Sequence, residues 1–359
     1  MNIRVLSPDR LTDRQIELWS LFQESNPELQ SPFFHPFYTR EAAKSFAGVE
    51  VAVFEDAGET LAFFPFQRTA GNRGIPVAGS LNDLQGVVSP RGFVFDAAEL
   101  VRACRLSGLR FSQLLAAQQP FHSYHWHVAD SPSMDLREGF DAFARQRRDE
   151  GSTLISRTRK KVRMAVREVG PMRFEADSRD SRIFDLLMEW KSQHFRRIRV
   201  PNPLAAPGVL DFLKRLLALR DDAFRGMVSV LYYGDRPAAA HVGIRCRNVL
   251  HSSVTAYNGE LARYSPGIAL AVELARAAEK IGICRIDLGA GNECFKTSFR
   301  SFGTQVAAGG VGLGSLATSM QRSWLCTKRW LQASRLHRPA RYVFRTIRGL
   351  FLHEPQHDC

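Results

Sequence analysis

The hydrophobic pattern of the first half of the chain predicts short helices and strands in alternation. Apolar residues at helical spacing predict a helix over Asp13–Phe22. Two strand-like runs, Val49–Glu55 and Thr60–Gln67, flank an Asp-Ala-Gly-Glu segment whose composition is typical of a hairpin turn. A helix near Ala97–Gly108 and a strand at Ser123–Val128 complete an α+β pattern, in which no catalytic motif stands out.

The pattern of the second half is clearer, and it centres on an antiparallel meander. Two helices are predicted first, over Ser181–Arg197 and Val209–Leu219, with the break PNPLAAPG between them. Three strand-like runs separated by tight turns follow: Gly226–Tyr233, Arg236–Arg245 and Val249–Tyr257. After a further helix that ends at Gly282, the pattern predicts the strand Cys284–Leu288, the short helix Cys294–Phe302 and the strand Thr304–Val311.

Length and charge add expectations about domains and partners. The 359 residues suit about two domains, and shifts in composition divide the chain into residues 1–150, 151–315 and 316–359. Arg and Lys outnumber Asp and Glu by 49 to 36, so the net charge is +13, which favours anionic partners such as phosphates, nucleic acid or an acidic membrane surface. Residues 316–352 contain eight basic residues, no acidic residue and interleaved aromatics, and they are predicted to form a basic helical tail.

Cysteine usage and hydropathy indicate the compartment. The six cysteines show neither a CxxC pair nor a cluster with histidines, which argues against a disulfide scaffold and a structural zinc site. The N-terminal residues contain no apolar run of the kind that a secretion signal needs. The uncharged stretch Ser301–Met320 is rich in glycine and hydroxyl side chains, so it is too weakly hydrophobic for a membrane span. We therefore expect a cytoplasmic protein without a metal site.

The segment Ser156–Arg167, which reads SRTRKKVRMAVR, is rich in arginine and lysine and contains no acidic residue. Ile155, Val162 and Ala165 give it an apolar stripe at helical spacing, so we expect an amphipathic helix. Its basic face is either simply solvated or lies at the mouth of a site for an anionic substrate or cofactor, and the sequence leaves both interpretations open.

A loop that opens directly into a helix offers the clearest candidate binding site. The sequence RYSPG at Arg263–Gly267 precedes the helical run IALAVELARAAEKIG. The first N–H groups of a helix have no partner within it, and together with the helix dipole they bind phosphate oxygens. Gly267 allows a close approach of the backbone, and Arg263 can add charge-assisted contacts. An ordinary tight loop before a helix is the alternative interpretation.

A second candidate site follows the next predicted strand. Asp287 lies near the end of this strand, a glycine loop follows it, and Lys296 comes shortly after the loop. A carboxylate, a flexible turn and a lysine at the carboxyl end of a strand suit a substrate crevice, in which Asp287 could orient an amine and Lys296 could stabilise a developing oxyanion. In the alternative interpretation, the two side chains make pairings that only fix the loop.

These elements, in this order, resemble the acetyltransferase-like domain of the GNAT superfamily. The resemblance is strongest to the CelD/BcsL-like branch, which is associated with cellulose and exopolysaccharide biosynthesis and is related to the FemAB peptidoglycan transferases. It rests on the YSPG loop, on Asp287, Gly289 and Gly291, and on Lys296 and Phe299. Leu288 stands where this branch usually has phenylalanine, and Phe295 stands in place of a tyrosine before the lysine. The resemblance covers roughly residues 150–310, and the N-terminal half fits as a degenerate first GNAT-like lobe.

The resemblance implies a mixed-sheet α/β fold with tandem GNAT-like lobes and an acyl-CoA-dependent N-acyltransferase activity. The acceptor would be an amine, such as that of an amino sugar used for envelope polysaccharide. The pyrophosphate of acetyl-CoA, or of another acyl-CoA, would lie over the loop and the following helix start, at Arg263, Tyr264, Ser265, Pro266, Gly267 and Ile268. Direct transfer from the thioester to the amine needs a base and a donor to the oxyanion. The candidate catalytic residues are Asp287, Lys296, His241, His251 and Tyr257.

Two further functions fit the sequence. A FemAB-like transferase would take its amino acid from charged tRNA, whose phosphates suit the net charge of +13. A non-catalytic accessory protein would keep the fold and use residues 316–352 to dock on an anionic membrane surface or a membrane-bound synthase. Binding of acetyl-CoA without affinity for tRNA would favour the acyl-CoA-dependent enzyme.

Overall fold

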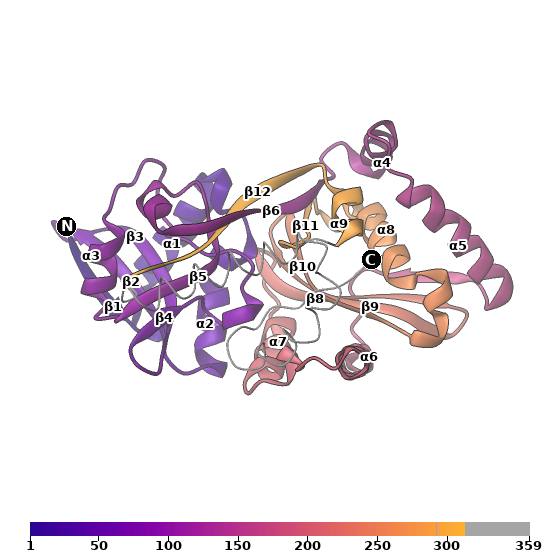
Figure 1. Cartoon of the computed structure of the whole chain (residues 1–359), viewed down its shortest axis with the longest axis horizontal. Helices are drawn as coiled ribbons and strands as arrows, with labels where there is room; N and C mark the ends of the chain where they lie inside the picture. The colour runs from indigo at the N-terminus through magenta and orange to yellow at the C-terminus, as the bar shows by residue number, and fades with distance from the viewer. Residues whose placement is uncertain (292, 313–359) are drawn as a thin grey trace, which may run out of the picture.

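The computed structural model describes residues 1–291 and 293–312 (Figure 1). The predicted basic tail at 316–359, with the membrane or synthase contact expected of it, lies outside the described residues. Within them, the fold is a mixed α/β arrangement built on a large sheet of 12 strands, which confirms the predicted fold class.

The strands of the sheet come from both halves of the chain. They are β1 (Asn2–Leu6), β2 (Val49–Asp56), β3 (Glu59–Thr69), β4 (Arg73–Ile75), β5 (Gly108–Leu115), β6 (His125–Asp135), β7 (Met172–Glu175), β8 (Phe224–Tyr233), β9 (Arg236–Cys246), β10 (Val249–Tyr257), β11 (Arg285–Asp287) and β12 (Phe302–Val311). Their order in the sheet is β1-β2-β3-β4-β5-β12-β6-β11-β10-β9-β8-β7. The predicted meander is confirmed, because β8, β9 and β10 pair antiparallel in sequence order.

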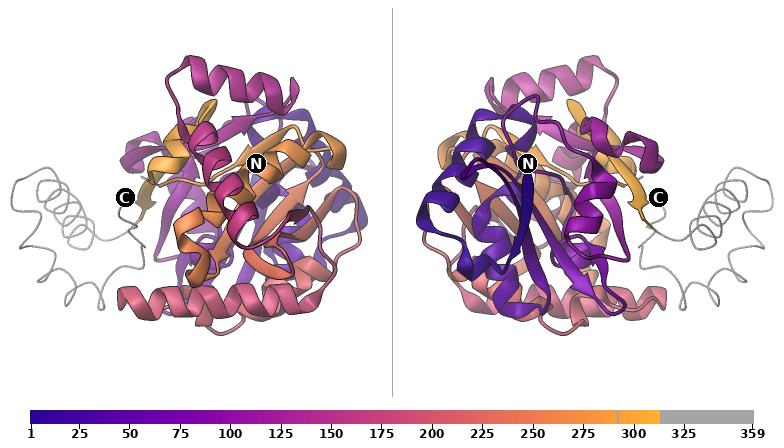
Figure 2. Two further views of the ribbon diagram at one scale, coloured as in Figure 1. Left: turned by 90° about the vertical axis from the view of Figure 1, so that its right-hand side faces the viewer. Right: turned by 90° about the vertical axis from the view of Figure 1, so that its left-hand side faces the viewer.

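The helices pack on the two faces of this sheet. They are α1 (Asp13–Ser25), α2 (Pro36–Ser45), α3 (Ala97–Ala103), α4 (Gly139–Asp149), α5 (Leu154–Glu168), α6 (Ser181–Ile198), α7 (Val209–Ala218), α8 (Pro266–Ala277) and α9 (Cys294–Phe299). In the C-terminal half, α6 and α7 cover one face, whereas α8 covers the other and carries α4 and α5 on its outer side (Figures 1 and 2).

Local sequence explains where several of these helices begin and end. Thr12 and Gln15 form a capping box at the start of α1, and the side chain of Asp180 caps α6. The helix predicted near Ala97–Gly108 ends earlier, at Ala103, because Arg105 adopts a left-handed conformation (φ 53°) and the chain then enters β5. The hydrophobic pattern predicted neither β5 nor β1.

Two strands cross between the halves of the chain. The end of β6 pairs with β11, from Ser133 opposite Asp287 to Asp135 opposite Arg285. In return, β12 leaves the C-terminal half and pairs with β5 over Val306–Val311. Because β6 and β12 also pair with each other, a continuous ribbon joins the two lobes (Figure 1). The sheet therefore runs through both lobes without an edge between them.

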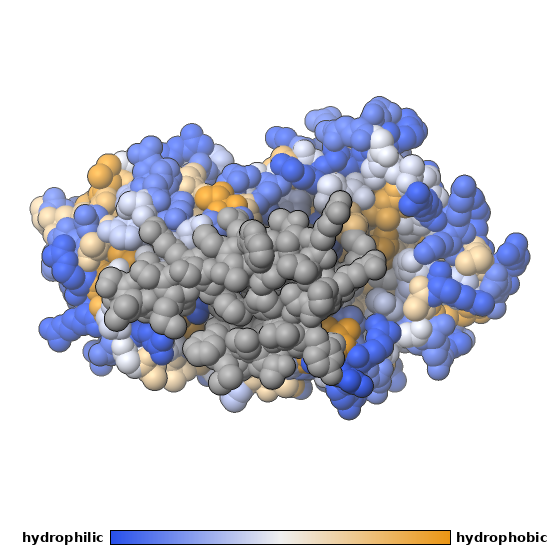
Figure 3. Space-filling model, viewed as in Figure 1, coloured by the Kyte–Doolittle hydropathy of each residue, from blue (hydrophilic) through white to orange (hydrophobic). Residues whose placement is uncertain are grey.

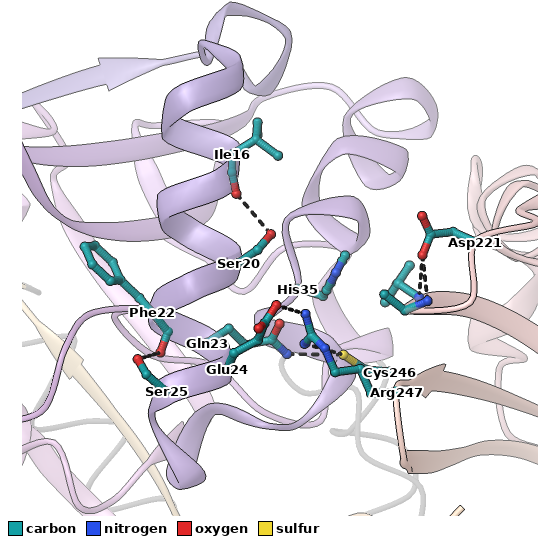
Figure 4. Close-up of polar contacts among 12 residues, drawn as sticks. Ile16, Ser20, Phe22, Gln23, Glu24, Ser25, His35, Asp221, Cys246 and Arg247 are labelled. Atoms are coloured by element: carbon teal, nitrogen blue, oxygen red, sulfur yellow. Dashed lines mark hydrogen bonds and ion pairs between the residues drawn. The ribbon is translucent and has the colours of Figure 1, made fainter. Parts of the chain in front are cut away.

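Polar and aromatic contacts also hold α1 and α2 against the C-terminal lobe (Figure 4). Gln23 of α1 donates to Cys246 Sγ at 3.3 Å, and Arg247 forms an ion pair with Glu24. The His35 ring, just before α2, stacks on Phe224 with centroids 4.7 Å apart. Burial lowers the pKa of His35 to about 3, so this ring is neutral and packs as an aromatic group.

Candidate active site

The strands β10 and β11 separate after a short parallel pairing. They are paired only from Val249 opposite Arg285 to His251 opposite Asp287. Beyond this point β10 continues to Tyr257, whereas the chain leaves β11 at Asp287 and turns at Gly289 (φ 71°). The edge of β10 that faces β11 is therefore open over its last residues, and an open strand edge offers backbone N–H and C=O groups to a ligand.

The start of α8 lies at the far end of this open edge. A Cβ atom on Gly267 would be 3.5 Å from Tyr257 Cδ1 and 3.9 Å from Thr255 Cγ2, so the helix begins against the end of β10. Ile268 and Ala269 both donate to the carbonyl of Ser265 at 3.1 Å. Over the described residues, the N–H of Gly267 has no acceptor and is left to bind an anion at the positive end of the helix dipole.

The basic helix predicted at Ser156–Arg167 is part of α5, and it lies beside this helix start. Lys161 of α5 donates to Ser265 Oγ at 2.7 Å. Neighbouring basic side chains on α5 are exposed and form no ion pair within the described part of the chain: Arg157, Arg159, Lys160 and Arg163. The surface over α4 and α5 is correspondingly hydrophilic (Figure 3). The basic side chains of α5 therefore lie beside the start of α8.

Two residues of the predicted cofactor set have other partners. Tyr264 is buried and donates to Glu168 Oε2 at 2.9 Å, and Arg263 forms an ion pair with the same carboxylate at 2.8 Å. These bonds lower the pKa of Glu168, that of Tyr264 contributing most, and they tie the end of α5 to the loop before α8. Tyr264 and Arg263 therefore position α5, while Ser265, Gly267 and Lys161 lie at the helix start.

The other end of the open edge carries a His–Asp pair. His251 of β10 is 2% exposed, and its Nε2 lies 2.8 Å from Oδ2 of Asp83. Asp83 belongs to a loop of the N-terminal lobe, and 34% of its side chain remains accessible. Burial alone would raise the pKa of Asp83, but the hydrogen bond from His251 and the charges of His251 and Lys296 outweigh it and lower the pKa. Asp83 is the accessible member of the pair.

The glycine loop after β11 closes around this pair. A Cβ atom on Gly289 would lie 3.0 Å from Asp83 Oδ2, and its positive φ also favours glycine. Farther along, Lys296 forms an ion pair with Glu293 at 3.1 Å and donates to the carbonyl of Ala290 at 3.3 Å. The structure thus places Asp83, which the sequence analysis did not contain, beside His251 and beside the glycine loop to which Lys296 is bonded.

The remaining predicted catalytic residues have different surroundings. Asp287 accepts from Ser133 Oγ at 2.7 Å and pairs with Arg285 at 3.0 Å, so its carboxylate is already occupied. His241 is 2% exposed, and its Nε2 lies 3.1 Å from Ser252 Oγ.

Burial lowers the pKa of His241 to about 3, so its ring stays neutral. Tyr257 is exposed at the end of β10, next to Gly267.

The comparison with family models finds one match, which covers most of the C-terminal lobe. Residues 154–297, which run from the start of α5 to α9, match the acetyltransferase (GNAT) domain family. This segment is therefore similar to a GNAT-type acyltransferase fold. The matched segment contains the open edge of β10, the start of α8, His251 and Lys296. A search of curated protein sequences finds no match.

Solved structures extend the similarity of fold beyond the matched segment. The C-terminal domain of a putative lysylphosphatidylglycerol synthetase from Agrobacterium fabrum has a TM-score of 0.54 at 14% identity, covering 86% of this chain and 95% of that one. L-PGS from Bacillus licheniformis gives 0.53 at 13%, covering 87% and 96%. FemX gives 0.51 at 10%, covering 86% and 96%. The shared fold therefore includes both halves of the chain.

No helix among the described residues is long and apolar enough to cross a bilayer.

Proposed function

We propose that the protein is an acyl-CoA-dependent N-acyltransferase that transfers its acyl group directly to an amine in a ternary complex. One observation carries this proposal. The open edge of β10 has a helix start and a lysine at one end, at Gly267 and Lys161, and a carboxylate–histidine pair at the other end, at Asp83 and His251. This arrangement suits an extended co-substrate with a diphosphate at one end and a reactive thioester at the other.

The residues at the start of α8 fit the diphosphate of an acyl-CoA. The Gly267 N–H and the helix dipole supply fixed positive potential, and Lys161 adds an ammonium group that donates to Ser265 Oγ at 2.7 Å. The exposed basic side chains of α5 extend this potential toward solvent. Beyond His251 the edge of β10 has no partner strand, so its backbone can pair with the amide groups of an extended pantetheine chain, except at the Thr255 carbonyl, which accepts a hydrogen bond from Lys191.

The Asp83–His251 pair supplies the acid–base step. The amine nitrogen attacks the thioester carbon, a C–N bond forms, and the C–S bond breaks as the thiolate leaves. The proton lost by the amine goes to the pair through the accessible carboxylate of Asp83, which His251 holds in place at 2.8 Å. The nucleophile is the amine itself, so no covalent intermediate on the enzyme is needed.

The acceptor class follows from the resemblance of the YSPG and Asp287–Phe299 motifs to the CelD/BcsL-like branch. We propose an amine of a sugar or of an envelope-polysaccharide precursor, acylated in the cytoplasm. Acetyl-CoA is the simplest donor of this kind, and it serves as the probe for the tests below.

A second candidate is the transfer of an amino acid from charged tRNA. The exposed basic face of α5 favours it, since unpaired Arg and Lys side chains suit a phosphate backbone. The fold shared with a putative lysylphosphatidylglycerol synthetase and with FemX also supports it. Affinity for tRNA that persists at moderate salt, without binding of acetyl-CoA, would favour this candidate.

Calorimetry with acetyl-CoA tests the proposed function through a matched pair of variants at Gly267. A side chain at this position has room, because its Cβ atom would make only ordinary contacts at 3.5 Å and beyond, and the backbone is helical. Gly267→Asp places a negative charge at the diphosphate site, whereas Gly267→Asn has nearly the same shape without the charge. We expect wild-type binding in the micromolar range and at least tenfold weaker binding for Gly267→Asp than for Gly267→Asn, or about 1.4 kcal/mol. Equal affinities in all three proteins would refute the proposed site.

A further inference from the structure

Lys191 is a partly buried ammonium group that the acid–base scheme above does not use. It projects from α6 toward the sheet, and its Nζ donates to the carbonyl of Thr255 at 3.3 Å. Thr255 lies on the open part of β10, and its side chain is next to the start of α8. Among the described residues, no carboxylate forms an ion pair with Lys191.

This ammonium group is unfavourable for folding unless a ligand compensates it. Burial lowers the pKa of Lys191, the largest effect, while the charge of Glu293 opposes the change and that of Lys296 adds to it. A desolvated charge without a counter-ion destabilises a protein, and replacing it with an apolar side chain of similar length is typically neutral or stabilising. Residues of this kind are expected where binding or catalysis needs the charge.

Its neighbours place Lys191 between the two ends of the proposed site. Thr255 connects it to Gly267 at the diphosphate end. The charges of Glu293 and Lys296 act on it from the glycine-loop side, and Lys296 also acts on Asp83. The bond to the Thr255 carbonyl therefore places the Lys191 ammonium group beside the part of β10 that has no pairing with β11.

We propose that Lys191 is a catalytic residue whose ammonium group donates a hydrogen bond to the acyl carbonyl oxygen. This inference rests on the proposed function and deepens it. As the amine attacks, the π electrons of the C=O bond move to the oxygen, and the fixed positive charge of Lys191 stabilises the resulting oxyanion. Collapse of this intermediate re-forms the C=O bond and expels the thiolate, while the amine proton goes to the Asp83–His251 pair.

Lys296 is less suited to this task than Lys191. Its ammonium group is already paired with Glu293 and bonded to the carbonyl of Ala290. Lys191 lies 5.6 Å from the centre of the Phe195 ring and has a single backbone acceptor among the described residues, so its ammonium group keeps donor capacity for a ligand. Lys191, which forms no ion pair within the described part of the chain, therefore gains more interaction energy from a new negative charge than Lys296 does.

Binding of two stable CoA thioethers tests this inference without an acceptor. S-carboxymethyl-CoA carries a carboxylate close to the position of the expected oxyanion, and S-ethyl-CoA is a neutral analogue of similar length. We expect the wild type to bind the carboxymethyl compound about tenfold more tightly, a difference of about 1.4 kcal/mol. Lys191→Met should abolish this preference while its affinity for S-ethyl-CoA stays within threefold of the wild-type value.

A matched control shows whether the preference for the carboxymethyl compound depends on the charge of Lys191 or on the net charge of the protein. Lys214→Met removes the same charge from an exposed position on the neighbouring helix α7, and it should keep the preference. The melting temperature of Lys191→Met should equal or exceed that of the wild type, as expected for removal of an uncompensated charge. A purely structural role would instead lower it.

The outcomes separate this inference from the proposed function. Tight binding of both thioethers, with a preference that survives Lys191→Met, would overturn the role of Lys191 and leave the acyl-CoA site in place. Failure of the wild type to bind either thioether would contradict the acyl-CoA site itself, and the role of Lys191 would fall with it.

Discussion

The substitution Asp83→Asn tests the proposed acid–base step most sharply. Asp83 is the accessible member of the pair, and its Oδ2 lies 2.8 Å from His251 Nε2. An asparagine has the same shape but carries no charge and accepts no proton. The substitution therefore removes the proton acceptor while it leaves the packing between the lobes nearly unchanged.

Two contributions set the expected size of the effect. Loss of a positioned general base typically lowers the rate by a factor of roughly 10² to 10⁴. The hydrogen bond to a charged carboxylate is worth about 1.5–3 kcal/mol, and part of it is lost with the charge. We expect a fall in kcat of about 100-fold or more, with the affinity for acetyl-CoA unchanged, because Gly267 and Lys161 are not affected.

The pH dependence gives a second readout with a definite sign. The pKa of Asp83 is lowered, so its carboxylate stays ionised and active through neutral and mildly acidic pH. Protonation of Asp83 should therefore slow the wild-type reaction only below the ordinary range of an aspartate, about pH 3.9, which separates this acidic limb from the one set at higher pH by protonation of the amine acceptor. This acidic limb should be absent from the residual activity of Asp83→Asn.

Thiol release from acetyl-CoA, with glucosamine as the acceptor, measures these rates. Asp287→Asn is the matched control, because it removes a carboxylate bonded to Ser133 and Arg285 and should reduce stability more than turnover. If Asp83 and His251 act as one unit, Asp83→Asn combined with His251→Gln should be no slower than the slower single variant. A kcat for Asp83→Asn within threefold of the wild-type value would refute the assignment.

The remaining predictions concern binding and stability. Lys161→Met should weaken acetyl-CoA binding about tenfold, or 1.4 kcal/mol, whereas Lys160→Met on the exposed face should change it far less; calorimetry compares the two. Gly289→Ala should destabilise the fold by about 1–2 kcal/mol because this residue has a positive φ. It should also reduce turnover, because the new methyl group would press on the carboxylate of Asp83. Gly58→Ala, with φ +88° and no atom near its Cβ position, should show the strain alone in denaturant unfolding. His241 has a pKa of about 3 when folded, so the unfolded chain binds the extra proton below about pH 6.5 and stability falls as the pH drops from there. His241→Gln should reduce this slope by about 1.4 kcal/mol per pH unit, measured by unfolding at several pH values; an unchanged slope would contradict the buried neutral state.

Much of the C-terminal lobe could be predicted from the sequence because its signals are local. The meander follows from alternating runs with tight turns between them, and the start of α8 follows from Pro266 and Gly267. β5 and β1 were missed because their pairing partners are far away in the sequence. The crossing of β6 and β12 between the lobes likewise has no local signal.

The site could be predicted only in part for the same reason. His251 and Lys296 lie in recognisable strand and loop patterns, but Asp83 comes from a loop rich in turn residues in the other lobe, and only folding brings it to His251. Lys191 resembles an ordinary exposed lysine of an amphipathic helix until its contact with Thr255 is known. The pattern of a helix start around Arg263 and Tyr264 predicted that both residues bind the cofactor. In the structure both side chains are instead bonded to Glu168 of α5.

A crystal structure with S-ethyl-CoA bound would test the central claim most directly. The account predicts diphosphate oxygens within hydrogen-bond distance of the Gly267 N–H and Lys161 Nζ, and the sulfur in the gap between β10 and β11 beside Asp83. Density for the diphosphate at another surface, with the edge of β10 beyond His251 free of ligand, would contradict it.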